Sequence, residues 1–195
     1  MRVSARILLI LVTCLLPVAC YADQALNDTA ILSQVLRSPN TNANFTVVAP
    51  MTTLSTLDGE TPEDLARSKK YVRESLKVED EHIDQLVVAL IQKNKKPVRL
   101  ELPSAPKDGY LVDYDGKFEN YFKDNGGGWE RWHTENPKAN GWTSVSLPAY
   151  DPQTGLILIY KGTQSHWRAG AGYLILYRYV NCQLEELGRV MLWIS

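Results

Sequence analysis

The chain has 195 residues, a formal net charge of −1 and 45% hydrophobic residues. This length suits one domain with an ordinary core, because a chain of roughly 150 residues buries about 70% of its unfolded surface on folding. The 21 basic side chains do not exceed the 22 acidic ones, which argues against nucleic acid or an anionic lipid surface as a partner.

Residues 1–22, MRVSARILLILVTCLLPVACYA, predict a secretory signal with a positive start, a short apolar run and small residues before a cut. Cleavage after Ala22 would leave residues 23–195 as a single globular domain, periplasmic or extracellular, without a transmembrane helix. It would also leave Cys182 as the only cysteine, which excludes an intrachain disulfide. The alternative is a lipoprotein anchored through Cys20.

Three helices are expected in the first half of the mature chain. Asn27 or Asp28 can cap a short helix, and FTVVAP (45–50) follows as a buried strand. Thr61 and the Pro-Glu-Asp after it predict the start of a helix that runs to about Leu76. A third helix is expected from about Asp80 until the lysines before Pro97.

The second half is expected to be mainly β. VRLEL (98–102) and YLVDY (110–114) alternate like strands, and residues 117–136 read as two short helical pieces broken by glycines. Four more strands are expected, with connections too short for a parallel crossover, near 142–149, 156–162, 172–180 and 184–194. The predicted class is α+β: N-terminal helices cover one face of a mainly antiparallel sheet that ends in a C-terminal four-strand meander.

Three stretches carry a resemblance to known proteins: WERWHTENPKANGWTSVSLPAYD (129–151), LILIYKGTQSHWRAGAGYLILYR (156–178) and LGRVMLWIS (187–195). They resemble a group of uncharacterised exported bacterial proteins with a Gly-rich hairpin and a C-terminal Trp-x-Ser ending. The resemblance implies one exported domain and no particular activity. Members of the group often carry cysteines beside the hairpin, where this chain has Ser165 and Ala169.

The hairpin GTQSHWRAGAGY (162–173) raises the question of a catalytic or phosphate-binding loop. Gly170 and Gly172 precede a strand rather than a helix, so they favour a turn or close packing over a phosphate site. Ser165 and His166 are neighbours, and neighbours on a strand point to opposite faces, which disfavours direct proton transfer between them. No catalytic residue is therefore assigned.

The sequence predicts neither a metal nor a cofactor. The three histidines are far apart, and EDEHID (79–84) reads as the charged start of a helix. LVDYDGKFEN (111–120) has Asp113, Asp115 and Glu119 around a glycine, but it lacks the full twelve-residue calcium pattern.

Aromatic side chains crowd the last third of the chain, where they could form core or a binding surface. Trp129 and Trp132 share one helical face, and Trp142 and Trp193 lie further along. As candidate ligand-binding residues we take those of the aromatic helix and the hairpin tip: Trp129, Trp132, His133, His166, Trp167 and Arg168.

Two function classes remain open on the sequence. The first is an exported, non-enzymatic module that binds an envelope component, a small ligand or a protein. The second is an envelope or extracellular hydrolase that uses His133 or His166 with a carboxylate such as Asp113, Asp115 or Glu130. Clustering of both histidines and a carboxylate around one cleft would favour the enzyme.

Overall fold

The computed structural model describes residues 26–37, 44–54, 57, 59–78, 81–123 and 127–195. Within these residues the helices, in chain order, are α1 (Asp28–Leu36), α2 (Pro62–Leu76), α3 (Glu81–Lys93), the 3-10 turns η1 (Pro106–Asp108) and η2 (Glu119–Phe122), and α4 (Gly128–Glu135). The strands are β1 (Phe45–Val48), β2 (Tyr110–Val112), β3 (Ala139–Val145), β4 (Ala149–Asp151), β5 (Leu156–His166), β6 (Ala169–Val180) and β7 (Gln183–Ile194).

All described strands belong to one mixed sheet in the order β2-β1-β3-β5-β6-β7, with β4 also paired to β5. The parallel pairs are β1 with β2 and β1 with β3. From β3 onward each neighbour is antiparallel, which confirms the α+β class and the C-terminal meander. The strand expected over 142–149 is divided into the end of β3 and the separate β4, and 98–102 forms only an isolated bridge at Arg99.

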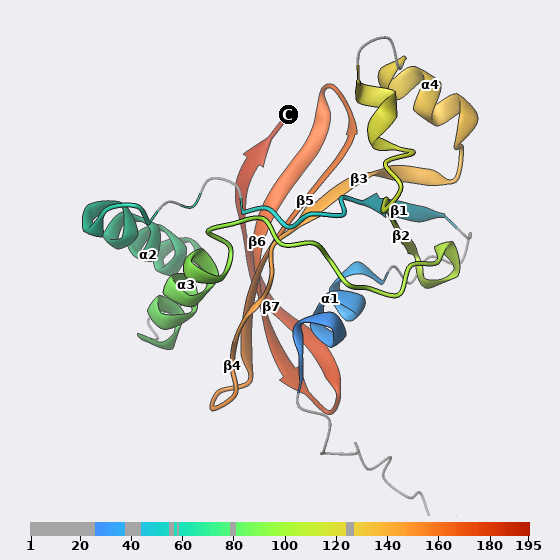
Figure 1. Ribbon diagram of the computed structural model, residues 1–195. Coiled ribbons are helices and arrows are strands. Elements are labelled where there is room, and N and C mark those ends of the chain that lie inside the picture. The colour runs from blue at the N-terminus through green and yellow to red at the C-terminus, as the bar shows by residue number, and fades with distance from the viewer. Residues whose placement is uncertain (1–25, 38–43, 55–56, 58, 79–80, 124–126) are drawn as a thin grey trace, which may run out of the picture.

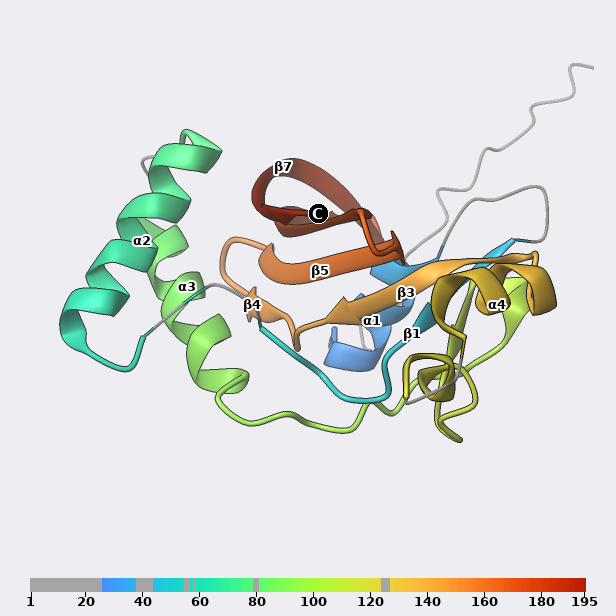
Figure 2. The same cartoon turned by 90° about the horizontal axis from the view of Figure 1, so that it is seen from above.

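The central strands are apolar on nearly every residue because both faces of the sheet are covered. Ile157 and Ile159 face a core that includes α1, whereas Leu158 and Tyr160 face α2 and α3. Figures 1 and 2 show α2 and α3 on one side of β5–β7 and α1 on the other. The expectation that the helices cover one face is therefore wrong for α1.

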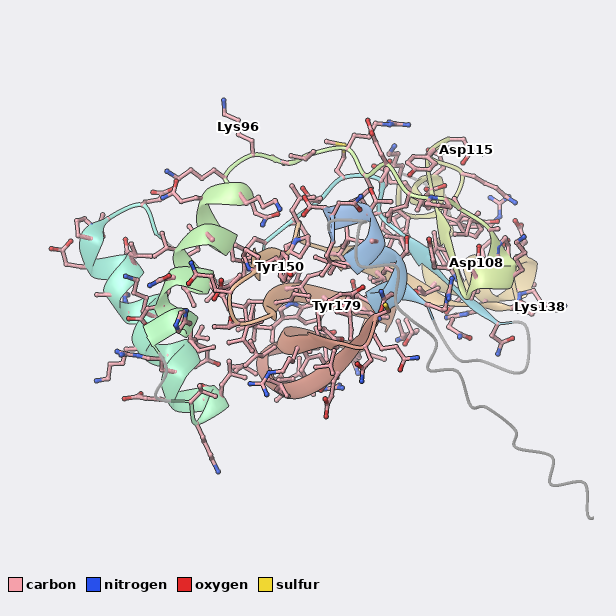
Figure 3. All side chains as sticks on the ribbon, turned by 90° about the horizontal axis from the view of Figure 1, so that it is seen from below. Lys96, Asp108, Asp115, Lys138, Tyr150 and Tyr179 are labelled. Carbon is pink, nitrogen blue, oxygen red and sulfur yellow. The ribbon has the colours of Figure 1, made fainter. Side chains whose placement is uncertain are left out.

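The face of the sheet that α1 covers holds a partly buried lysine. Lys161 on β5 donates from Nζ to the Val35 carbonyl in the last turn of α1, at 3.1 Å. Burial lowers the pKa of the Lys161 ammonium, and the nearby Arg189 guanidinium lowers it further. Figure 3 views the molecule from below, with Tyr150 and Tyr179 labelled near α1. Both rings pack against the hydrophobic core that α1 shares with the sheet.

The helix starts follow the expected capping chemistry. Asn27 accepts a hydrogen bond from the Ala30 N–H at 2.9 Å, and Thr61 accepts one from the Asp64 N–H at 3.1 Å. Each side chain satisfies a backbone donor that the first helical turn leaves without an intrahelical partner. The expected start of α3 at Asp80 lies outside the described residues.

The glycines of the β5–β6 hairpin are explained by close packing. Gly162 and Gly172 face each other across the two strands, and Trp193 of β7 lies against both. A Cβ on Gly172 would lie 2.0 Å from Trp193 Nε1, which no side chain can tolerate. The Trp193 indole donates to the Tyr160 hydroxyl at 2.9 Å and is partly buried against the α2–α3 core.

The predicted signal, with Cys20 and the cut after Ala22, lies outside the described residues. None of the described helices combines the length and apolarity that crossing a bilayer requires. Cys182, in the turn between β6 and β7, is disulfide-bonded. The expectation without a disulfide concerns the chain cleaved after Ala22 and stays a prediction, because the full-length chain also contains Cys14 and Cys20.

Candidate functional site

The candidate site is built on a cluster of aromatic side chains that packs α4 against one end of the sheet. Trp129 and Trp132 lie three residues apart on one face of α4, and their rings lie 5.3 Å apart. Trp132 is fully buried, and its indole donates to the Ala139 carbonyl at 3.3 Å. Phe118 packs 4.9 Å from the Trp132 ring. This cluster fixes α4 against β1 and β3.

The loop before η2 is organised by the buried carboxylate of Asp113. Its oxygens accept hydrogen bonds from the Phe118 N–H at 3.1 Å and the Glu119 N–H at 2.8 Å. Burial raises the pKa of the Asp113 carboxyl, although these two N–H groups oppose the shift. Asp113 therefore positions the start of η2, from which Glu119 and Phe122 project.

The tip of the β5–β6 hairpin is fastened to α4. Figure 1 shows the hairpin rising beside this helix. His133 donates from Nε2 to the Ser165 carbonyl at 2.8 Å, and its ring stacks on Trp129. Trp167 lies against Gly128, where a Cβ would come 2.9 Å from the indole. Glycine suits Gly128 for a second reason, because its φ of 55° is in the left-handed region.

An open cleft of about 350 Å³ lies between the hairpin tip, α4 and η2. Its lining combines four aromatic rings with a carboxylate and an amide, from Glu119, Phe122, Trp129, Trp142, Gln164 and Trp167. Trp167 at the rim is 60% exposed, whereas Trp129 is 2% exposed. Phe122 contacts Trp129, Trp142 and Trp167 at centroid distances of 4.7, 6.4 and 6.1 Å. The volume falls in the usual range for small-molecule sites, roughly 300–1,000 Å³.

The structure separates the six candidate residues into three groups. Trp129 and Trp167 line the cleft, and Trp132 belongs to the core behind it. His133 holds the hairpin in place, and His166 accepts a hydrogen bond from the Arg168 N–H at 3.4 Å within the turn.

Four lining residues were missed as binding residues by the sequence reasoning: Glu119, Phe122, Trp142 and Gln164. The strand register brings Trp142 opposite Gln164, and residues opposite each other on antiparallel strands share a face. The strand predicted over 156–162 ended before Gln164, so the sequence alone could not place this pair together.

The described residues do not gather the groups that hydrolysis would need. The Ser165 hydroxyl donates to the Ala169 carbonyl at 3.3 Å, in the same hairpin. Among the described residues, the ion pairs that involve a histidine are limited to His82, whose Nδ1 lies 3.1 Å from Asp151 Oδ2 at the end of β4. Among the described residues no three His, Cys, Asp or Glu side chains form a group that could hold a metal ion.

A second hollow, of about 770 Å³, lies along α2 and is less suited to a ligand. Long charged side chains dominate its lining and pair with nearby groups, Lys70 with Glu74 and Arg73 with Asp84. A small ligand there would have to compete with these solvent-exposed ion pairs. The aromatic cleft is therefore the better candidate.

Comparison of the chain with protein-family models, with characterised proteins and with solved structures found no match.

Proposed function

We propose that this protein is an exported binding module that acts without catalysis and takes a small envelope ligand into the aromatic cleft. The observation that carries the proposal is Trp167, a 60% exposed indole at the rim of a cleft lined by three further aromatic rings. Large aromatic side chains are usually buried, and an exposed one beside an apolar hollow is typical of a binding surface. Export rests on the signal in residues 1–22 and on the resemblance to exported bacterial proteins.

The rigidity of the cleft supports this proposal. Trp129 lines the cleft with a ring that is otherwise packed in the core, and Phe122 contacts all three lining tryptophans. His133 fixes the hairpin that carries Trp167. A preformed site loses little conformational entropy when it binds, so even a small contact area can give useful affinity.

The hydrolase alternative has less support from the hydrogen bonds of its candidate groups. His133 Nε2 is used on a backbone carbonyl, and the Ser165 hydroxyl donates to another. A nucleophile needs a base within hydrogen-bond reach, and the base needs an orienting group. These bonds give both side chains a role in holding the hairpin tip.

The test uses the indole N–H signals in a ¹⁵N–¹H NMR spectrum, of which five are expected from five tryptophans. The exported protein would be titrated with low-mass fractions of its native envelope. We expect shifts at Trp129, Trp142 and Trp167, and loss of the response in Trp167→Ala. Tyr71→Ala, which removes a 43% exposed aromatic on α2, is the matched control and should respond like the wild type. Fractions that shift none of the three cleft indoles would contradict the proposal.

A further inference from the structure

The hydrogen bonds of the five tryptophans divide them into two groups. Trp132 donates to the Ala139 carbonyl, and Trp193 donates to the Tyr160 hydroxyl. The three tryptophans that line the cleft have no indole hydrogen bond to any described residue: Trp129, Trp142 and Trp167. Indole N–H groups in partly buried positions usually find an acceptor. The cleft therefore offers up to three donors that solvent or a ligand must satisfy.

The side-chain amide of Gln164 adds polar groups that no described residue hydrogen-bonds. It lies opposite Trp142 on β3 and opposite Gly170 on β6. Gly170 carries no side chain, and a Cβ there would lie only 3.1 Å from Gln164 Cγ. Within the described part of the chain no hydrogen bond reaches the Gln164 amide. An amide can donate twice and accept twice, so it can bind a hydroxyl group in either direction.

Glu119 supplies an acceptor whose charge is already balanced. Its backbone N–H is fixed by Asp113, and its carboxylate lies 3.2 Å from the Lys123 ammonium. A cationic ligand in the cleft would compete with Lys123 for the same carboxylate. A neutral hydroxyl can donate to the carboxylate while that ion pair remains.

Resting on the proposed function, we infer that the ligand is a neutral saccharide, stacked on Trp167 and hydrogen-bonded by the cleft indoles, Gln164 and Glu119. The C–H face of a sugar ring matches an exposed aromatic face, and its hydroxyls both donate and accept. A quaternary ammonium ion would match the aromatic rings through cation–π attraction, but it cannot accept from an indole N–H. A purely apolar ligand would leave the Gln164 amide desolvated without a partner, which is costly.

The test is an NMR titration of the intact exported protein with defined probes at millimolar concentration. The saccharide probes are glucose, galactose, mannose, N-acetylglucosamine and their β-linked disaccharides. Choline chloride represents the cation and benzyl alcohol the apolar ligand. We expect at least one saccharide to shift the cleft indoles and the Gln164 side-chain amide, with the signals of Trp132 and Trp193 less affected.

Three variants separate the ligand classes. Trp167→Ala should weaken saccharide binding by about tenfold or more, and Gln164→Leu by about fivefold, as expected for a lost net hydrogen bond of roughly 1 kcal/mol. Glu119→Gln keeps an acceptor and should change saccharide affinity by less than about threefold, whereas it should weaken a bound cation strongly. Circular dichroism would confirm that each variant is folded.

The outcomes also separate this inference from the proposed function. If choline or benzyl alcohol shifts the cleft indoles and no saccharide does, the saccharide inference is wrong and the cleft remains a binding site. The same holds if Gln164→Leu binds saccharide as well as the wild type. If no probe shifts these indoles while an envelope fraction does, only the saccharide inference fails. If neither shifts them, both fail.

Discussion

The packing of Trp193 over the glycines of β5 and β6 leads to a prediction about stability. Gly172→Ala adds one methyl group at a position where Cβ would lie 2.0 Å from Nε1 and 2.5 Å from Cε2 of the indole. Both atoms belong to a rigid ring, and the ring must move away. Gly172 does not have a positive φ, so the backbone itself accepts alanine. The whole penalty should therefore come from the displaced indole.

The magnitude follows from what the indole loses. Its hydrogen bond to the Tyr160 hydroxyl, 2.9 Å long, contributes about 1 kcal/mol. Replacing a fully buried tryptophan by alanine costs roughly 3–5 kcal/mol, and a partly buried ring such as Trp193 is expected at about 2 kcal/mol. Gly172→Ala should therefore lower the free energy of unfolding by about 3 kcal/mol and the melting temperature by about 10 °C.

The assay is a double-mutant cycle by urea unfolding, in which the midpoint changes and the slope does not. With Trp193→Ala already present, Gly172→Ala should be neutral or stabilising by up to about 1 kcal/mol, because alanine is less flexible than glycine in a strand. Gly188→Ala is the control, since its Cβ would meet Leu76 at an ordinary 3.4 Å. Equal destabilisation by Gly172→Ala in both backgrounds would show that the Trp193 indole is not the source of the penalty.

Two further predictions concern the hairpin and the partly buried lysine. Ser165→Ala should change both stability and ligand binding little, measured by thermal unfolding and titration, because its hydroxyl makes one long bond to Ala169; covalent labelling of Ser165 by a serine-directed probe would contradict it. Burial lowers the pKa of Lys161 in the folded state below its ordinary value of 10.5. Between the folded and the unfolded pKa the unfolded state binds more protons, so the free energy of unfolding should rise with pH in that range. Lys161→Met should reduce this rise in urea unfolding measured up to pH 9.5, and an identical slope would count against it.

Much of the fold could be predicted because its signals are local. Capping by Thr61 and the proline after it gave the start of α2, and the apolar runs around Ile159 gave the central strands. The position of α1 on the opposite face could not be predicted in this way. An amphipathic helix shows which of its own sides is buried, and it carries no information about which sheet face it will cover.

The strand expected over 98–102 is absent because a local pattern again did not determine the neighbour of the segment. VRLEL has the alternation of a strand, and Leu100 and Leu102 are buried as the pattern requires. The segment forms a bridge between Arg99 and Met51 and bonds the Leu100 N–H to the Pro50 carbonyl, without a continuous ladder. Pro97 before the segment and Pro103 after it have no backbone N–H, so a ladder cannot extend past either end. Alternation predicts burial on one side, and ladder formation depends on a neighbouring strand.

The cleft was harder to predict because its residues meet only through tertiary structure. Helical spacing placed Trp129 and Trp132 on one face, but only the fold shows that Trp132 turns into the core and Trp129 reaches the cleft. Phe122 enters from η2, and Gln164 enters through the pairing of β3 with β5. Each comes from an element whose own pattern gives no sign of binding.

Trp167 has two roles in this arrangement, and experiments on the cleft must separate them. Its ring forms part of the ligand surface, and it also rests on Gly128 and meets Phe122 edge-on at 6.1 Å. Truncation to alanine therefore removes a contact that holds the hairpin to α4 as well as a stacking surface. Since the His133–Ser165 bond remains, the hairpin tip keeps one attachment. A loss of affinity in Trp167→Ala with unchanged α4 signals would then report stacking, whereas a loss accompanied by shifts throughout α4 would report the attachment.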